Sequence, residues 1–300
     1  ANVSRWALRD LHMAHFAISD IERQSFTSFE RTNRTGIGWA GADAFEQGAP
    51  RQAQHTLAPS LRVWNEDWVA QSRDDGYELH AIEEGYSLDL KLRPLKREVI
   101  NGENGISQRG PPPGNASHYY TISRLDSSGK VTVGGETFEV TGLSWMDHEF
   151  GTSFLGDAQV GWDWFCIQLD DGRDLMLCRI RQRDGSVDPH SSGTLVYADG
   201  RSIHLNYEEF SLVPSETWRS PNSGSVYPIA WGIDLPRYGL RLKVTAAFED
   251  QELRTPESTG VTYWEGSVAI DGTTEERPIG GRGYLEMTGY AGQSMGSILR

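Results

Sequence analysis

The stretch VGWDWFCIQLDDGRDLMLCRI, residues 160–180, decides the fold class. Two runs rich in aromatic and apolar residues, 164–169 and 175–180, flank the polar segment Asp170-Asp171-Gly172-Arg173. An Asp-Gly pair between such runs is typical of the turn of a β-hairpin. Similar Ser-Gly, Gly-Gly and Asp-Gly pairs recur at 128–129, 134–135, 184–185, 199–200 and 271–272. The sequence therefore predicts a chain that is nearly all β, a sandwich or a barrel, with few short helices.

The same hairpin carries the two cysteines of the chain, Cys166 and Cys178. A two-residue turn would pair Cys166 with Leu177, whereas a three-residue loop with Gly172 at its bulge position would pair Cys166 with Met176. Neither register places the two sulfur atoms opposite each other. We therefore predict two free, buried thiols, and their presence leaves the redox compartment open.

Residues 162–169 follow the period of two that is typical of a strand. The odd-numbered face begins with Asp163 and continues with three apolar residues, and the even-numbered face begins with Trp162 and Trp164. Both faces are largely apolar, so Asp163 is expected in an apolar setting. A carboxyl group there either has a raised pKa and serves as an acid, or is a structural carboxylate bonded to backbone or Arg. Both readings stay open, and Asp163 is the first candidate catalytic acid.

A second group of titratable residues lies in SWMDHEFG, residues 144–151. On an extended strand Asp147 and Glu149 share one face and His148 points to the other. Asp147 and His148 are the next catalytic candidates, because a carboxyl group and an imidazole can serve as acid and base. No His-rich spacing of the zinc type is present, so we expect neither a metal nor a cofactor.

Acidic and aromatic residues alternate on several predicted strands, and the chain has ten tryptophans. This interleaving suits a pocket that binds an apolar molecule and offers it a few polar contacts. The predicted ligand-binding residues are Trp145, Trp162, Trp164, Tyr263, Glu265, Tyr284 and Glu286.

Charge and missing motifs exclude several function classes. The formal net charge is −14 and no Lys/Arg-rich run is present, so nucleic acid is not an expected partner. No apolar stretch has the length needed for a transmembrane segment. There is no Gly-x-Ser-x-Gly elbow and no Walker loop, which disfavours serine hydrolase and NTPase chemistry. The sequence does not indicate the oligomeric state.

Several motifs together resemble the AttH-like, hydroxyneurosporene synthase (CrtC) family over nearly the whole chain. They are HMAHFAISD (12–20), the Pro-rich loop 105–120, WMDHEFG (145–151), GWDWF (161–165), YWEG (263–266) and GYLEMTGY (283–290). The resemblance implies two lipocalin-like antiparallel β-barrels packed together. It also implies a periplasmic or secreted location and a link to carotenoid 1,2-hydratases, although many members are described as secreted hydrolases.

The resemblance divides the chain into an N-terminal barrel, 1–155, and a C-terminal barrel, 156–300. Family members usually open on a Glu-Trp-Trp-Tyr strand that this chain does not have, so the first barrel is expected to lack its first strand. The Asp-His motif is followed here by Phe150, where the family usually has Trp. By resemblance, Asp147, His148 and residues 162–164 lie near the junction of the barrels.

The leading functional hypothesis is a protein that binds an elongated apolar molecule, an isoprenoid or a lipid, at the inter-barrel junction. It includes acid-catalysed hydration of an alkene, with the proton from Asp163 or Asp147. The rings of Trp162 and Trp164 would stabilise the developing carbocation by cation–π attraction. The alternatives are a non-enzymatic periplasmic lipid carrier or attachment-related protein, and a hydrolase.

Overall fold

The computed structural model describes residues 10–35, 38–43, 61–111, 114–152 and 155–292. Most of these residues lie in antiparallel strands. The helices among them are two single 3-10 turns, η1 (Tyr207–Glu209) and η2 (Pro236–Tyr238). The predicted all-β class with few short helices is confirmed. Within this described part of the chain, no helix has the length and apolar character of a membrane span.

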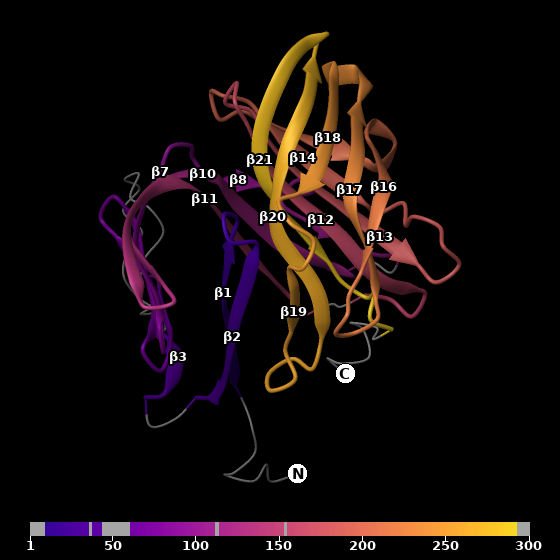
Figure 1. Ribbon diagram of the computed structural model, residues 1–300. Coiled ribbons are helices and arrows are strands. Elements are labelled where there is room, and N and C mark those ends of the chain that lie inside the picture. The colour runs from indigo at the N-terminus through magenta and orange to yellow at the C-terminus, as the bar shows by residue number, and fades with distance from the viewer. Residues whose placement is uncertain (1–9, 36–37, 44–60, 112–113, 153–154, 293–300) are drawn as a thin grey trace. The chain divides into compact units, whose positions relative to one another are not determined.

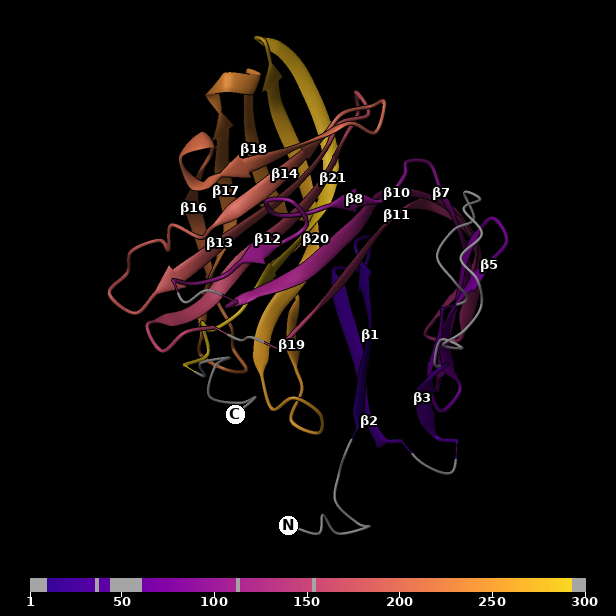
Figure 2. The same cartoon turned by 180° about the vertical axis from the view of Figure 1, so that it is seen from behind.

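The strands form three sheets, which Figures 1 and 2 show from opposite sides. The smallest is the hairpin of β1 (Leu11–Asp20) and β2 (Ser25–Arg34). The second has the order β11-β10-β7-β6-β5-β4-β3, and β8 and β9 also pair with β10. Its strands are β3 (Ala40–Ala42), β4 (Arg62–Asn65), β5 (Trp68–Arg73), β6 (Gly76–Glu83), β7 (Tyr86–Pro94), β8 (Val99–Ile100), β9 (Ser107–Gln108), β10 (Ala116–Val133) and β11 (Glu136–Gly151).

The third sheet has the order β15-β14-β13-β12-β21-β20-β18-β17-β16, and β19 pairs with β20. Its strands are β12 (Gln159–Leu169), β13 (Asp174–Gln182), β14 (Ser192–Val196), β15 (Ser202–Asn206), β16 (Ser211–Arg219), β17 (Val226–Leu235), β18 (Leu240–Ala246), β19 (Glu252–Arg254), β20 (Thr262–Thr274) and β21 (Arg277–Met287). Most neighbours along this path are consecutive along the chain, as in an antiparallel meander. The exceptions are β12 with β21, which are far apart in sequence, and β18 with β20, which are separated by β19.

Contacts between residues group the chain into two compact units. The first takes the described residues of 1–17, 28–95 and 125–144, and the second takes those of 18–27, 96–124 and 145–300. This grouping does not follow the expected division after residue 155, because residues 96–124 and the end of β11 group with the C-terminal strands. The domains 1–155 and 156–300 stay a prediction.

The hairpin of β12 and β13 has the register with the longer loop. Cys166 lies opposite Met176, and Trp164 lies opposite Cys178. Gly172 adopts the left-handed conformation, with φ of 85°, that such a loop needs and that glycine tolerates best. Both cysteines are free, as predicted; Cys166 is buried and Cys178 is partly buried.

The third sheet curls round its own core. The guanidinium group of Arg179 on β13 donates a hydrogen bond of 3.3 Å to the carbonyl of Leu212 on β16, although these strands are far apart in the strand order. The predicted period of two in β12 is confirmed on this core side, where Phe165, Ile167 and Leu169 are fully buried. Phe165 packs edge-on against the Trp231 ring at 5.3 Å between centroids.

A buried cluster of charges attaches the segment 96–124 to this sheet within the second unit. Asp174 begins β13 and is fully buried. Its carboxylate accepts hydrogen bonds from Lys96 Nζ at 2.6 Å, Ser123 Oγ at 2.8 Å and Arg124 Nη2 at 2.7 Å. Figure 2 shows β10, which carries two of these donors, running along the same side of the molecule as β12 and β13. The cluster fixes β10 over the face of β12 that points away from the core.

The first unit has its own aromatic core. Phe16 stacks on Phe29 with 5.7 Å between ring centroids and meets the edge of Trp68 at 5.8 Å. Arg31 lies over the Trp68 ring at 4.3 Å and pairs with Glu83 at 2.7 Å. Apolar packing therefore gives this unit a core separate from that of the curled sheet.

Replacing Asp174 by Asn is expected to destabilise the protein strongly. The change keeps the shape but leaves Lys96 and Arg124 without their buried counter-charge, which costs about 3–5 kcal/mol in comparable cases. Urea denaturation of the whole chain measures the loss. The matched control is Asp199→Asn, because the pair of Asp199 with Arg201 is exposed and contributes little. Equal losses in the two variants would contradict the role of the cluster.

The thiols are expected to be unreactive in the native protein. Burial raises the pKa of Cys178 to about 12 and that of Cys166 well above its usual value. Because the thiolate is the reactive form, Ellman's reagent should find almost no thiol before denaturation and two after it. Rapid reaction of either thiol in the folded protein would show that the β12–β13 hairpin is not sequestered.

Candidate active site

The candidate site is built on the face of β12 that points away from the core. Trp162, Trp164 and Cys166 alternate along this face with the core residues. On one side β12 pairs with β21, where Trp164 lies opposite Glu286 and Cys166 lies opposite Tyr284. The strand order therefore brings two tryptophans of β12 beside an acid and a phenol of β21.

The adjacent strand β20 adds a second acid to this face. Glu265 lies directly opposite Glu286 in the β20–β21 pair. Side chains directly opposite each other on antiparallel strands have Cβ atoms about 5 Å apart, so the charges of two glutamates there repel each other. Tyr263 lies two residues earlier on the same face of β20. Burial and, after it, the charges of Glu265 and Glu286 raise the pKa of Tyr284, and Tyr263 adds a smaller effect.

Residues of β10 and β11 complete the site from the opposite side. The indole Nε1 of Trp164 donates to the hydroxyl of Tyr119 at 3.1 Å. Trp145 meets Trp164 edge-on, with 6.3 Å between centroids and 80° between planes. Asp147 follows two residues after Trp145 on β11 and receives a hydrogen bond of 3.0 Å from its indole. Three aromatic rings thus lie next to a carboxyl group.

Asp147 combines access to solvent with an unusual pKa. The residue is exposed, yet enough protein surrounds its carboxyl group that desolvation raises its pKa to about 6. Hydrogen bonds from Thr121 at 2.5 Å, from Trp145 and from Tyr119 oppose this rise. An accessible carboxyl group that titrates near neutral pH is suited to proton transfer.

Glu286 and Glu265 form a pair that retains a proton near neutral pH. Burial, opposed by a hydrogen bond of 3.1 Å from the Trp162 indole and assisted by the charge of Asp147, raises the pKa of Glu286 to about 7. Burial and the charge of Glu286 raise the pKa of Glu265 to about 8. Acids whose surroundings push their pKa values apart are a common basis for acid–base catalysis.

The two faces of β11 carry different groups, as the sequence predicts. Glu149 shares the face of Asp147 and binds Arg109 and Ser117. Arg109 lowers the pKa of Glu286 and is therefore the cationic group of the site. His148 lies on the other face, where its Nδ1 and the hydroxyl of Tyr120 are 2.9 Å apart. The structure does not bring His148 to the carboxyl cluster.

Asp163 lies on the core side of β12, away from Trp162 and Trp164. It is fully buried and paired with Arg179 at 2.8 Å and Arg181 at 3.3 Å. The hydroxyl of Tyr290 donates to its other oxygen at 2.8 Å. These contacts favour the reading of Asp163 as a structural carboxylate, and a catalytic role for it stays a prediction.

The structure brings all seven predicted ligand-binding residues and Asp147 together, and their role in binding stays a prediction. The sequence did not identify Tyr119, Thr121 and Arg109 as neighbours of this cluster. The signal that could have found Tyr119 is the adjacent pair Tyr119-Tyr120 in the sequence. For Arg109 and Thr121 no local pattern exists, since they reach the site through the packing of β10 against β12. Among the described residues, no group of three or more His, Cys, Asp or Glu side chains is arranged to hold a metal ion.

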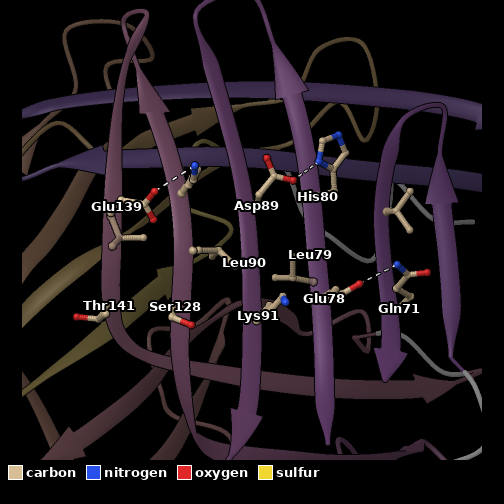
Figure 3. A pocket seen from close by; sticks show the side chains of 14 residues that line it. Gln71, Glu78, Leu79, His80, Asp89, Leu90, Lys91, Ser128, Glu139 and Thr141 are labelled. Carbon is tan, nitrogen blue, oxygen red and sulfur yellow. Dashed lines mark hydrogen bonds and ion pairs between the residues drawn. The ribbon is translucent and has the colours of Figure 1, made fainter. Parts of the chain in front are cut away.

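A separate hollow of about 630 Å³ lies in the first unit on β5, β6, β7, β10 and β11 (Figure 3). Four of its titratable side chains lie in exposed pairs, His80 with Asp89 at 2.5 Å and Lys130 with Glu139 at 3.1 Å. Such pairs are typical of a solvated face. The hollow offers space, whereas the reactive groups lie in the second unit.

Comparison with known proteins finds a solved structure of similar fold and two relatives that are similar in sequence. A crystal structure of an AttH protein from Nitrosomonas europaea is 32% identical, has a TM-score of 0.81, and matches over 96% of this chain and 84% of that protein. Kievitone hydratase of Fusarium solani subsp. phaseoli is 22% identical over 212 residues, which are 69% of this chain. The match spans only 58% of that hydratase's own length.

Dehydratase asqC of Emericella nidulans is 21% identical over 285 residues, 92% of this chain and 78% of the dehydratase. Two distant relatives are thus named as a hydratase and a dehydratase. The family model described as AttH-like matches residues 1–290. The chain therefore belongs to the AttH-like family.

Proposed function

We propose that this protein adds water to a carbon–carbon double bond of a largely apolar small molecule, or removes water to form one. The observation that carries the proposal is the cluster of Asp147, Glu265 and Glu286 among tryptophan rings, with carboxyl pKa values of about 6, 8 and 7. Hydration and dehydration need a proton donor and a proton acceptor on either side of the same bond.

The order of the pKa values assigns the two roles. At neutral pH Asp147 is mostly ionised, whereas the Glu265–Glu286 pair still holds a proton. Asp147 is therefore the base, and the glutamate pair is the acid. Contact with the Trp162 indole, rather than the pKa order, selects Glu286 as the member of the pair that delivers the proton. The proposed donor thus differs from Asp147 and Asp163, the donors expected from the sequence, and that expectation stays a prediction.

In the hydration direction Glu286 transfers its proton to one alkene carbon, and the π electrons form the new C–H bond. The other carbon becomes electron-poor and bonds to the oxygen of a water molecule. Asp147 takes the proton that this water releases, which leaves a neutral alcohol. Dehydration is the reverse sequence, so the same two groups exchange roles.

The aromatic rings supply a site for the electron-poor carbon. Indole faces attract a cation, by about 2 kcal/mol or more where water is excluded. Trp164 is held by Tyr119 and by the edge of Trp145, so its ring has a fixed orientation. An apolar ligand, such as an isoprenoid, fits these surfaces, and the names of the hydratase and dehydratase relatives support the reaction class.

Asp147→Asn and Glu286→Gln are each expected to lower turnover by about 10²- to 10⁴-fold, because each removes one proton-transfer group. The probes are kievitone, after which one relative is named, and squalene as a linear isoprenoid alkene. Incubation in water enriched in the heavy oxygen isotope, followed by mass spectrometry, detects the new hydroxyl group. Activity should rise as Asp147 ionises near pH 6 and fall as the glutamate pair loses its proton at pH 7 to 8.

The matched control is Asp89→Asn, which makes the same change at an exposed pair in the first unit and should leave turnover intact. Asp163→Asn should lower stability more than turnover per folded molecule. Full activity of Asp147→Asn would refute the assignment of the base. Quenching of tryptophan fluorescence by a probe without any product would favour the carrier alternative.

The raised pKa values also make stability depend on pH, independently of any substrate. Folded Glu286 binds its proton more tightly than the unfolded chain does, so its contribution is complete below about pH 4.5 and is lost as the pH rises through about 7. The free energy of unfolding should fall by roughly 1–3 kcal/mol from pH 5 to pH 8, allowing for partial exposure. Glu286→Gln should flatten this dependence in urea denaturation, while Glu139→Gln, at an exposed pair, should not. Parallel curves for all three proteins would show that Glu286 is ionised throughout.

A further inference from the structure

A chain of hydrogen bonds runs from the interior of the second unit to Asp147. The hydroxyl of Thr194 on β14 donates to Asn101 Oδ1 at 2.7 Å. The amide of Asn101 donates to Thr121 Oγ1 at 2.7 Å, and the Thr121 hydroxyl donates to Asp147 at 2.5 Å. Thr194, Asn101 and Thr121 are at most 2% exposed. Three of the four residues that form these hydrogen bonds are therefore buried, and Asp147 is the one that has access to solvent.

The direction of the chain follows from the number of hydrogens. An ionised carboxylate only accepts hydrogen bonds, and a threonine hydroxyl has a single hydrogen. The Thr121 hydroxyl must donate this hydrogen to Asp147, so its oxygen accepts a hydrogen bond from the Asn101 amide. The amide oxygen of Asn101 then faces Thr194, which must donate to it. With the amide reversed, Thr121 would donate to Asn101 and leave Asp147 without this donor.

The backbone holds Asn101 where it can act in this way. Its N–H donates to the carbonyl of Tyr119 at 2.9 Å, directly after β8 pairs with β10. Thr194 is fixed between Met176 on β13 and His204 on β15. The backbone therefore fixes the positions of Asn101 and Thr194, and the Asn101 amide lies between two hydrogen-bond partners, Thr194 and Thr121.

We propose that Asn101 is a positioning residue that acts through Thr121: it fixes the direction of the hydrogen bond to Asp147 and so keeps this carboxyl group in its proton-accepting form. The role as a base rests on the proposed function, whereas the hydrogen-bond direction does not. Asn101 touches neither the carboxyl group nor the tryptophan face, so its effect is indirect.

Other groups also act on Asp147. Trp145 and Tyr119 donate hydrogen bonds to it, and Glu286 and Cys166 are the neighbouring titratable groups that feel its charge. These contacts come from β10, β11, β12 and β21 and do not pass through Thr121. A double-mutant cycle separates the two routes, because coupling between Asn101 and Thr121 appears only in their joint effect.

The experiment measures the pKa of Asp147 directly, by carbon NMR of side-chain carboxyl groups in the full chain, with Asp147→Asn to assign the signal. Thr121→Val should raise this pKa by about one unit, since it removes a hydrogen bond to a charged group. Asn101→Leu should raise it by roughly a third of that, through the lost polarisation and orientation of Thr121. The double variant should match Thr121→Val alone.

Three further variants make the result decisive. Thr121→Ser keeps the hydroxyl and should restore the native pKa of Asp147. Asn65→Leu removes a buried amide in the first unit, with similar loss of packing, and should not move it. If Asn101→Leu fails to fold, Thr194→Val tests the same chain from its far end and should raise the pKa by a smaller amount.

No shift in Asn101→Leu, or an equal shift with and without Thr121, would overturn the proposal. The readout needs no substrate, so it stands even if neither kievitone nor squalene is converted. Where a probe is converted, the acidic limb of the activity profile should move to higher pH by the shift that NMR measures. A shifted NMR pKa with an unmoved limb would retain the hydrogen-bond chain and refute Asp147 as the base.

Discussion

The buried carboxylate of Asp174 is the constraint on which the candidate site depends. It lies at the start of β13 and binds Lys96, Ser123 and Arg124, all from the segment that leads into and through β10. Burying these charges is costly, and only mutual pairing offsets that cost. Because the donors have no other buried partner of opposite charge in the cluster, β10 has one favourable position over β12. Tyr119 and Thr121 then necessarily lie beside Trp164 and Asp147.

The two faces of β12 show how one strand separates stability from chemistry. On the core face, Asp163 is matched by Arg179 and Arg181, and its charge is compensated. On the other face, Asp147 and Glu286 have few opposite charges and are desolvated, which raises their pKa values. Acids left in this state reduce stability, and such cost is typical of functional sites. The contrast locates the chemistry on the face that carries Trp162 and Trp164.

Membership of the AttH-like family and the likeness to an AttH crystal structure settle the architecture. They do not fix a substrate, because one fold supports many functions and the hydratase and dehydratase relatives are distant. The chemical argument therefore depends on side chains of this protein. The site has three acids with different pKa values, together with Arg109 and several indole rings of fixed orientation. This combination favours proton transfer at an apolar ligand.

The sequence by itself determined what local chemistry can determine. The turn pairs at 134–135, 171–172, 184–185 and 199–200 and the period of two correctly predicted turns, the β12–β13 hairpin and the separation of the two cysteines, because these depend on neighbours along the chain. The pairs at 128–129 and 271–272 were wrongly predicted as turns: they lie inside β10 and β20, because pairing with the neighbouring strands β7 and β18 continues through them. Motif resemblance correctly identified the family. The preference for Asp163 over Asp147 could not be decided this way, since both are acids between aromatic residues. Only the tertiary structure shows that Asp163 is paired with Arg179 and Arg181, whereas Asp147 is desolvated and has no such pair within the described part of the chain. Ion pairs and desolvation depend on side chains that are distant in sequence.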